Sequence, residues 1–219
     1  MRFLIIVLLC LSACQSGNKS NPNVDKKFRA LKREGELGKR VSVRILKKYP
    51  RYENAQVQNY ISSLGRSAVV RLGRQELYYY FAVLSSKEAK SFAAPGGFVF
   101  VTTGLIKKLK NEDQLIGVLS REIARVNYKF DYKSTLKEKD MSKAVEVIYT
   151  KLVSQKLSQK ETHTLDNEAI MGMVTLNYSP EEYRPISLSP AYSSKVISNI
   201  KNRSKAAERE RFKQLQARL

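Results

Sequence analysis

Residues 121–125 read Arg-Glu-Ile-Ala-Arg, and the types and spacing of these side chains are those of an altered metal site. Arg121 and Arg125 stand four positions apart, so on a helix they share one face, with Glu122 next to them around the turn. With histidines in place of the arginines, the segment would be H-E-x-x-H, in which two imidazoles hold zinc and the glutamate activates a water molecule. The glutamate is present here, and both histidine ligands are replaced.

The residues around this pentapeptide predict a buried helix from Asn111 to Val126. Asn111 followed three residues later by Gln114 is typical of a helix start. Apolar side chains then recur at helical spacing, at Leu115, Val118, Leu119, Ile123 and Val126. Such a helix would hold Glu122 and the two arginines in fixed positions.

Upstream of this helix, residues 91–109 read SFAAPGGFVFVTTGLIKKL. Together with the helix, this segment resembles zinc metallopeptidase family forty-eight, the family of the CAAX prenyl endopeptidases and the periplasmic outer-membrane-quality-control metalloproteases. Members typically carry N-A-F-A-x-P-G-G, a short strand, a G-L-L helix and then H-E-x-x-H. The similarity extends from about residue 34 to the carboxyl end.

The resemblance implies roles for particular positions. Glu122 falls on the general base of the family, and Arg121, Arg125 and Thr164 fall on its three zinc-ligand positions. Asp166 falls on the aspartate that orients a zinc-binding histidine in relatives.

The resemblance also implies a substrate-binding edge. In the family, the sheet beside the central helix holds an extended substrate through backbone hydrogen bonds. This edge would comprise Pro95, Gly96, Gly97, Phe98 and Val99.

The histidine content argues against a zinc enzyme. The sequence contains one histidine, His163, so no alignment produces a two-histidine site. Arginine cannot serve as a ligand, because its guanidinium has no free lone pair and stays cationic. We therefore expect no cofactor and no peptide hydrolysis, since Glu122 would lack a polarised water to deprotonate. For His163 itself, an exposed or helix-capping role is favoured over a residual metal site.

The two arginines need partners if the site is buried, because an unpaired buried charge costs several kcal/mol. We predict an ion pair between Arg121 and Asp166. Arg125 would engage Glu122, Glu161 or a backbone carbonyl. The alternative is a rearranged helix on which both arginines face solvent.

The first residues predict an exported lipoprotein. Arg2 precedes an apolar run over residues 3–11, which is too short for a membrane-spanning helix of about 20 residues. Small residues then precede Cys14, the expected site of lipidation, and an ordinary secretory signal is the alternative. We divide the chain into a signal peptide at 1–13, a flexible linker at 14–24 and a metallopeptidase-like domain at 25–219. Because Gln15 follows the cysteine, the periplasmic face of the outer membrane is the expected location.

Charge limits the classes of partner. Lysine and arginine number 40 against 20 acidic residues, a formal net charge of +20. Such a chain favours anionic membranes or wall polymers, and the export signal argues against nucleic acid. A solvated basic surface without a specific partner is the alternative.

Patterning along the rest of the chain predicts a helix-rich α+β domain with a small sheet beside the central helix. Helices are expected at 25–49, 53–72 and 135–156, the last opened by a Thr135–Glu138 capping box. Strands are expected at 76–84 and 98–102, joined through the turn at residues 94–97.

Three functional hypotheses follow. The favoured one is an inactive pseudo-peptidase that binds envelope polypeptides or a partner protease, as a chaperone or an adaptor. The second is an active zinc metalloendopeptidase of the cell envelope. The third is a basic structural lipoprotein that tethers anionic envelope polymers.

Overall fold

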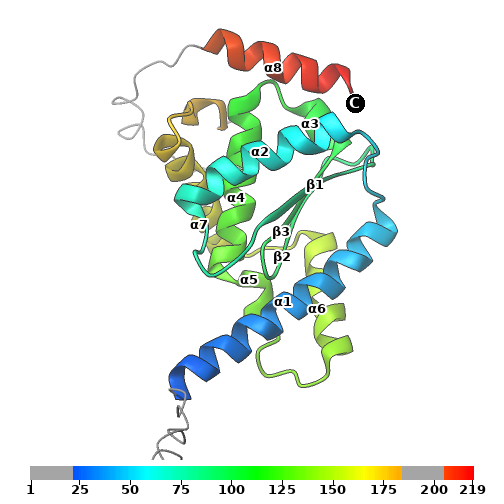
Figure 1. Ribbon diagram of the computed structural model, residues 1–219, viewed down its shortest axis with the longest axis vertical. Helices are drawn as coiled ribbons and strands as arrows, with labels where there is room; N and C mark the ends of the chain where they lie inside the picture. Colours follow the sequence, from blue (N-terminus) through cyan, green and yellow to red (C-terminus); the bar gives the residue numbers. More distant parts are fainter. Residues whose placement is uncertain (1–21, 184–204) are drawn as a thin grey trace, which may run out of the picture. The chain divides into compact units, whose positions relative to one another are not determined.

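The computed structural model describes residues 22–183 and 205–219 (Figure 1). Of these residues, those from 34 onward form one compact unit, and residues 22–33 belong to a separate one. The predicted signal peptide and its lipidated Cys14 lie outside the described residues. Helix α1 runs from Pro22 to Lys48 and so begins within the predicted linker. No helix in the described ranges is both long enough and apolar enough to cross a membrane.

A three-stranded sheet lies at the centre of the larger unit. Its strands are β1 (Tyr80–Leu84), β2 (Ser91–Ala94) and β3 (Phe98–Thr102), in the order β1-β3-β2. Strand β3 pairs parallel with β1 and antiparallel with β2. The predicted turn therefore joins β2 to β3, and the expected direct connection between β1 and β3 is wrong. Gly96 and Gly97 make this turn with φ of 75° and 95°, which side-chain-bearing residues rarely adopt.

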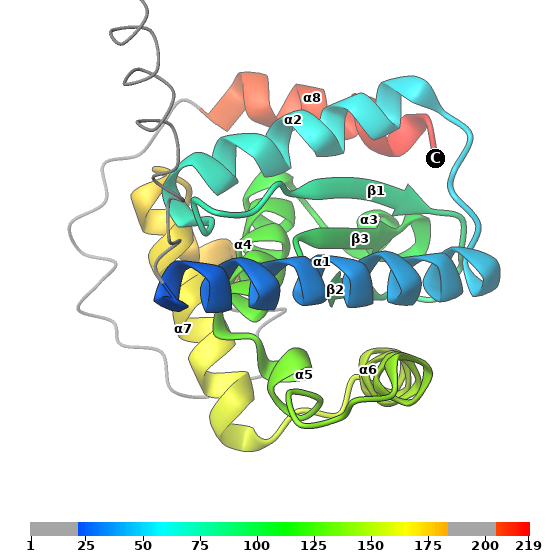
Figure 2. The same ribbon diagram turned by 60° about the horizontal axis from the view of Figure 1, so that its bottom comes forward.

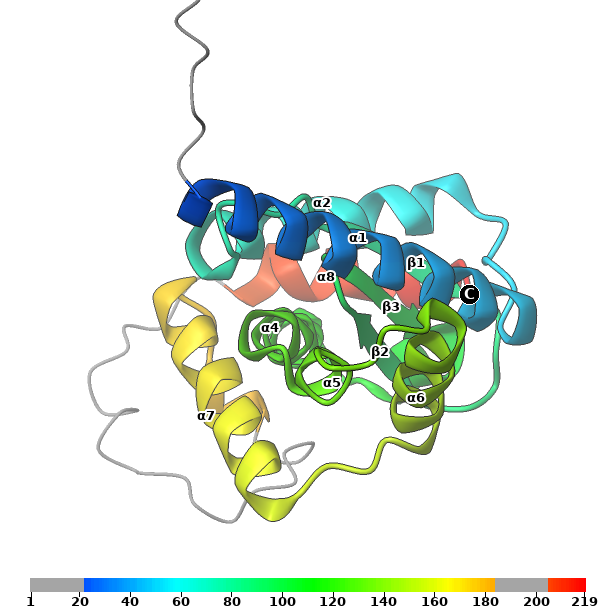
Figure 3. The ribbon, with the colours of Figure 1, turned by 90° about the horizontal axis from the view of Figure 1, so that it is seen from below.

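Helices account for most of the remaining described structure and confirm the helix-rich α+β class. They are α2 (Ala55–Leu72), α3 (Thr103–Lys108), α4 (Glu112–Tyr128), α5 (Phe130–Lys133), α6 (Met141–Ser154), α7 (Gln159–Thr175) and α8 (Lys205–Ala217), with a short 3₁₀ turn at Pro180–Tyr183. Figure 3 shows α4 nearly end-on, with α7 on one side and the sheet on the other.

Helix α6 begins later than predicted. Asp140 caps it by accepting from the amides of Ser142 and Lys143, at 2.8 and 3.3 Å. The Thr135 hydroxyl instead donates to the Tyr132 carbonyl, at 2.9 Å. The predicted capping box is therefore wrong, because residues 135–140 belong to the turns that follow α5.

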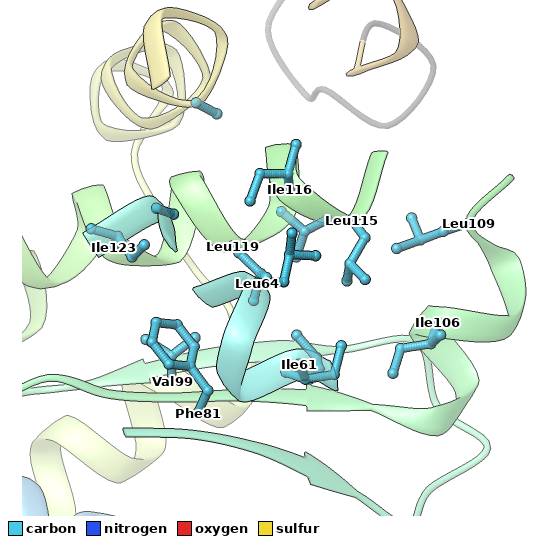
Figure 4. Close-up of a cluster of buried hydrophobic side chains, with 14 of the residues drawn as sticks. Ile61, Leu64, Phe81, Val99, Ile106, Leu109, Leu115, Ile116, Leu119 and Ile123 are labelled. Carbon is cyan, nitrogen blue, oxygen red and sulfur yellow. The ribbon is translucent and has the colours of Figure 1, made fainter. Parts of the chain in front are cut away.

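Alternation along the strands places apolar side chains on both faces of the sheet. Val99 and Val101 face the main cluster, which α2, α3, α4 and α7 complete (Figure 4). Phe98 and Phe100 face a second cluster formed with α5, α6 and the part of α1 beyond residue 34. Figure 2 shows the sheet enclosed between these two layers. Both faces are thus covered, so an extended peptide could pair with the sheet only at an edge strand.

Candidate functional site

Helix α4 carries the altered motif, and the structure confirms the predicted helix. The Asn111 side chain caps it by accepting from the Gln114 amide at 2.9 Å. Its first turn holds Glu112 and Asp113, whose charges suit the positive end of the helix dipole. It ends at Lys129, which takes a left-handed conformation with φ of 56°. Nearly every residue of α4 is buried, so its polar side chains must find partners within the protein.

Close packing around α4 brings Tyr183 and Asp166 to the motif. A Cβ on Gly117 would lie 2.4 Å from a ring carbon of Tyr183, so the glycine allows the ring to rest directly on the helix. The Tyr183 hydroxyl then donates to Asp166 Oδ1 at 3.0 Å. Asp166 lies on α7 and is fully buried.

Arg121 forms the predicted ion pair. Its Nε atom donates to Asp166 Oδ1 at 3.0 Å, and its Nη1 atom lies 3.5 Å from Glu122 Oε1. Burial works against the charged guanidinium, but the charges of Glu122 and Asp166 and the hydrogen bond to Asp166 outweigh it and raise the pKa of Arg121. The same surroundings, dominated by burial, raise the pKa of the Tyr183 hydroxyl well above its ordinary value.

Arg125 has a different partner from those predicted. Its Nε and Nη2 atoms donate to the two carboxylate oxygens of Asp131, at 2.6 and 3.0 Å. The arginine is 2% exposed and the aspartate 3%, which also contradicts a helix with both arginines facing solvent. Burial opposes the charge of Arg125, but this two-pronged pair with Asp131 raises its pKa above the ordinary value. The left-handed turn at Lys129 folds the chain back and places Asp131 within reach.

Lys151 extends this pair into a network. Its Nζ atom donates to the Phe130 carbonyl at 3.1 Å and lies 3.9 Å from Asp131 Oδ1 and 3.4 Å from Glu161 Oε1. Glu161 also accepts from Ser158 in the capping box that opens α7. Burial opposes its charge, yet the Ser158 hydrogen bonds and Lys151 lower the pKa of Glu161. Glu161 is therefore near the site but pairs with Lys151 and not with Arg125.

Glu122, at the general-base position, is 1% exposed. Its Oε1 atom accepts from the Ser91 hydroxyl at 2.8 Å. Its Oε2 atom is buried with no hydrogen-bond partner among the described residues. The carboxylate is thus held between Ser91 and Arg121, with one oxygen still available as an acceptor.

Thr164, at the third ligand position, and its neighbour His163 both lie on α7. The Thr164 hydroxyl donates to the Lys160 carbonyl at 2.9 Å. His163 is half-buried, and its Nε2 atom has no hydrogen-bond partner in the described part of the chain. The expectation of an exposed or capping histidine is therefore wrong for this side chain.

These side chains do not fit a zinc ion of the H-E-x-x-H type. Two of the three ligand positions carry guanidiniums, each already bound to a buried aspartate. The third carries a hydroxyl bound to its own helix. In residues 22–183 and the described end of the chain, no three His, Cys, Asp or Glu side chains come together as a metal-binding group.

The residues predicted to form a substrate-binding edge do not lie at an edge of the sheet. Phe98 and Val99 belong to β3, which is paired on both sides, and the turn of Pro95, Gly96 and Gly97 is buried. A centre strand cannot receive another strand, so the prediction of an edge at these positions does not agree with the sheet order.

The exposed edge on this side belongs to β2, and side chains of the same protein occupy it. The pairing of β2 with β3 turns the main-chain groups of Ser91 and Ala93 outward. Gln155 Nε2 donates to the Ser91 carbonyl at 2.8 Å. Beside Ala93, the space bounded by Arg125 and Asp131 is a cavity of about 10 Å³. That volume holds no more than a water molecule.

Four side chains that complete the site were missed by sequence analysis: Ser91, Asp131, Lys151 and Tyr183. Of these four, only Asp131 could have been inferred from the sequence. Two buried arginines require two carboxylates, and Asp131 is the first acidic residue after the helix.

Comparison with known proteins agrees with this architecture. No curated protein matches the sequence. The family model described as Peptidase family M48 matches residues 52–181, which is more than half of the chain. This stretch contains α2, the sheet, α4 and α7, and so covers the altered site apart from Tyr183. The chain therefore belongs to peptidase family M48 and carries a metallopeptidase-like domain.

Proposed function

We propose that this protein is a pseudo-peptidase that acts as an adaptor in the cell envelope. The observation that carries the proposal is the pairing of Arg121 with Asp166 and of Arg125 with Asp131. Two fixed positive charges stand at the ligand positions, together with the carboxylates that neutralise them. A metal ion placed among them would meet strong repulsion and no neutral nitrogen donor.

The rival hypothesis of an active metalloendopeptidase requires more than a metal. Glu122 would have to contact a water molecule beside a bound substrate. The residue is only 1% exposed, and its carboxylate is hydrogen-bonded to Ser91. Raising the pH cannot free the arginines, because their pKa values are raised further by their partners. The burial of Glu122 and the permanent charge of the two arginines therefore favour a non-catalytic role.

Between the chaperone and adaptor roles, the state of the sheet edge favours the adaptor. A chaperone of this fold would hold extended polypeptides along β2, where Gln155 now bonds Ser91. The adjoining 10 Å³ cavity leaves no room for a side chain of a bound peptide. Partner binding would then use the outer surface of the fold, with a partner protease as the expected class.

The test of the pseudo-peptidase role combines metal analysis with proteolysis. The purified protein is incubated with excess zinc, desalted and analysed for metal, and then mixed with casein and with a reduced, unfolded substrate protein. We expect substoichiometric zinc and no cleavage above that of the matched Glu122→Gln variant. Chelator-sensitive cleavage that is lost in Glu122→Gln would overturn the proposal.

The same preparation separates adaptor from chaperone. Fluorescence anisotropy with a labelled unfolded polypeptide should show no saturable binding for the wild type. Gln155→Ala, which frees the Ser91 carbonyl, is the informative variant, and Gln159→Ala on the surface of α7 is its control. Saturable binding by the wild type would favour the chaperone role over the adaptor.

Envelope location depends on residues outside those described, and we propose lipidation at Cys14 on the sequence pattern alone. Labelled palmitate should be incorporated into the wild type in cells and not into Cys14→Ala. Membrane fractionation should then place the wild type with the outer membrane. Equal labelling of both proteins would remove the anchor from the proposal.

A further inference from the structure

A cavity of about 460 Å³ lies at the opposite end of α4 from the altered site. It is formed by α2, the first turn of α4, Tyr178 and α8, and Figures 1 and 2 show α8 running beside α2. From Glu112 to Arg121 the helix rises about 14 Å, so the two sites are separate. The lining residues are Gln56, Asn59, Tyr60, Ser63, Leu64, Glu112, Tyr178, Arg211 and Arg218.

The wall formed by α4 is a buried carboxylate held by two tyrosines. Glu112 is 3% exposed, and its Oε2 atom accepts from the Tyr60 hydroxyl. Its Oε1 atom accepts from the Tyr178 hydroxyl at 2.9 Å. Burial, and then the hydrogen bond to Glu112, raise the pKa of Tyr60, which keeps this hydroxyl protonated. The Tyr60 oxygen retains a lone pair that can accept a hydrogen bond from a ligand.

The rim supplies positive charge. Arg211 comes from α8, has a side chain that is 58% exposed, and places Nη2 3.8 Å from Glu112 Oε1. Arg218 lines the same cavity. The cavity is lined by two positive guanidiniums and one negative carboxylate, and that carboxylate already accepts hydrogen bonds from two hydroxyls. The net charge of the lining side chains is therefore positive. The cavity thus repels cations and attracts an anionic group.

The remaining wall is polar and comes from one helix. Gln56, Asn59 and Ser63 are exposed residues of α2 that line the cavity. Their amides and hydroxyl can donate and accept at once, which suits a ligand carrying several hydroxyl groups. Leu64 is the one aliphatic residue among the lining side chains, so a purely apolar ligand finds little surface.

We propose that this cavity binds a sugar unit that carries a carboxylate, as part of an acidic saccharide. Arg211 and Arg218 would bind the carboxylate, because planar guanidiniums match its two oxygens. The hydroxyls of the ring would bond with Asn59, Ser63 and the Tyr60 oxygen. The volume lies within the range of small-ligand sites and leaves one end of the sugar open to solvent for a polymer to continue. This inference goes beyond the adaptor role and does not depend on it.

The test uses glucuronic acid as the acidic probe and glucose as its neutral counterpart. Titration of each into the purified, isotopically labelled protein is followed by amide chemical shifts. Glucuronic acid should bind with a dissociation constant on the order of 1 mM, as for a ligand of this size. Shifts should concentrate in α2, the first turn of α4 and α8. Glucose should bind about tenfold more weakly, because it lacks the carboxylate.

Two variants locate the site. Arg211→Gln should weaken glucuronic acid binding about tenfold and leave glucose binding unchanged. Arg66→Gln, which removes an exposed arginine of α2 outside the cavity, is the matched control and should bind as the wild type does. Asn59→Ala should weaken both sugars, and its exposed position makes a folding defect improbable as a cause.

Other outcomes would overturn the proposal. Equal dissociation constants for glucuronic acid and glucose would show that the arginines do not bind the carboxylate. Inorganic phosphate or acetate binding as tightly as glucuronic acid, with the same shifts, would reduce the cavity to a simple anion site. Equal weakening by Arg211→Gln and Arg66→Gln would show that net charge, and not this cavity, governs binding. The proposal would also be wrong if no amide chemical shift changed at a glucuronic acid concentration about 20-fold above the expected dissociation constant.

Discussion

Buried carboxylates lie near both ends of α4, but their charges are compensated in different ways. Near the carboxyl end, Asp131 and Asp166 pair with guanidiniums of α4, and the cavity beside Arg125 and Asp131 is only about 10 Å³. At the first turn, Glu112 is held by two neutral hydroxyls beside a cavity of about 460 Å³. The position that matches the family's chemistry is therefore closed, and the accessible polar site lies elsewhere.

Under the proposed pseudo-peptidase role, this difference teaches how side chains can take the place of a metal ion. At the positions that match the family's zinc ligands, Arg121 and Arg125 supply positive charge from within the chain, and each pairs with an aspartate. A site neutralised in this way needs no ligand, whereas the first turn of α4 keeps groups that a ligand can still reach.

The largest expected effect is at the fully buried pair. Asp131→Ala leaves Arg125 charged without its partner, and the free energy of unfolding should fall by about 3 to 5 kcal/mol. Urea unfolding measures this loss. The double variant Arg125→Met/Asp131→Leu should recover most of it, because no buried charge remains. A loss below about 1 kcal/mol for Asp131→Ala would show that the pair is not structural.

Asp166→Ala should have a smaller effect, about 2 to 3 kcal/mol. The Arg121 side chain is 14% exposed and keeps Glu122 Oε1 at 3.5 Å, so its charge is not stranded. Asp166→Asn should lose less than Asp166→Ala, because an amide oxygen can still accept from Tyr183. If Asp166→Ala proves as damaging as Asp131→Ala in the same urea experiment, the two pairs do not differ as their exposure indicates.

Tyr60→Phe should lower the free energy of unfolding by about 1 kcal/mol. Glu112 keeps Tyr178 and the nearby Arg211, and the open cavity lets water replace the lost hydroxyl. Thermal unfolding with Tyr78→Phe as the control, at an exposed tyrosine, isolates the contribution of the hydrogen bond. A loss as large as that of Asp131→Ala would mean that the first turn of α4 is as closed as the altered site.

The smallest effect concerns alkaline pH. Burial, then the hydrogen bond to Glu112, raise the folded-state pKa of Tyr60 above its ordinary value of about 10. Its contribution to stability is therefore fully present below pH 10 and declines as the pH rises above that value. The difference in unfolding free energy between the wild type and Tyr60→Phe should narrow by about 0.8 kcal/mol between pH 9 and 10.5. A difference that widens over this range would contradict the raised pKa.

Local patterns in the sequence were sufficient for several of these features. The apolar period and Asn111 predict α4, and the spacing of Arg121 and Arg125 places both on one face of it. The Gly-Gly pair predicts a tight turn, and a single histidine excludes a two-histidine zinc site. The Arg121–Asp166 pair also followed, because matching the family's spacing aligned the two positions. Apart from that pair, each inference needed only the composition, neighbours along the chain or a fixed helical repeat.

Other features depend on contacts that no local pattern encodes. Strand β2 was missed because its four residues show no alternation, and its pairing with β3 decides which strand forms the edge. Asp131 reaches Arg125 only because Lys129 reverses the chain in a left-handed turn. The cavity of about 460 Å³ needs α2, α4 and α8 to meet across more than 100 residues, with Arg211 close to Glu112. Side-chain partners of this kind are set by the packing of whole elements, which is why the tertiary structure was required to identify them.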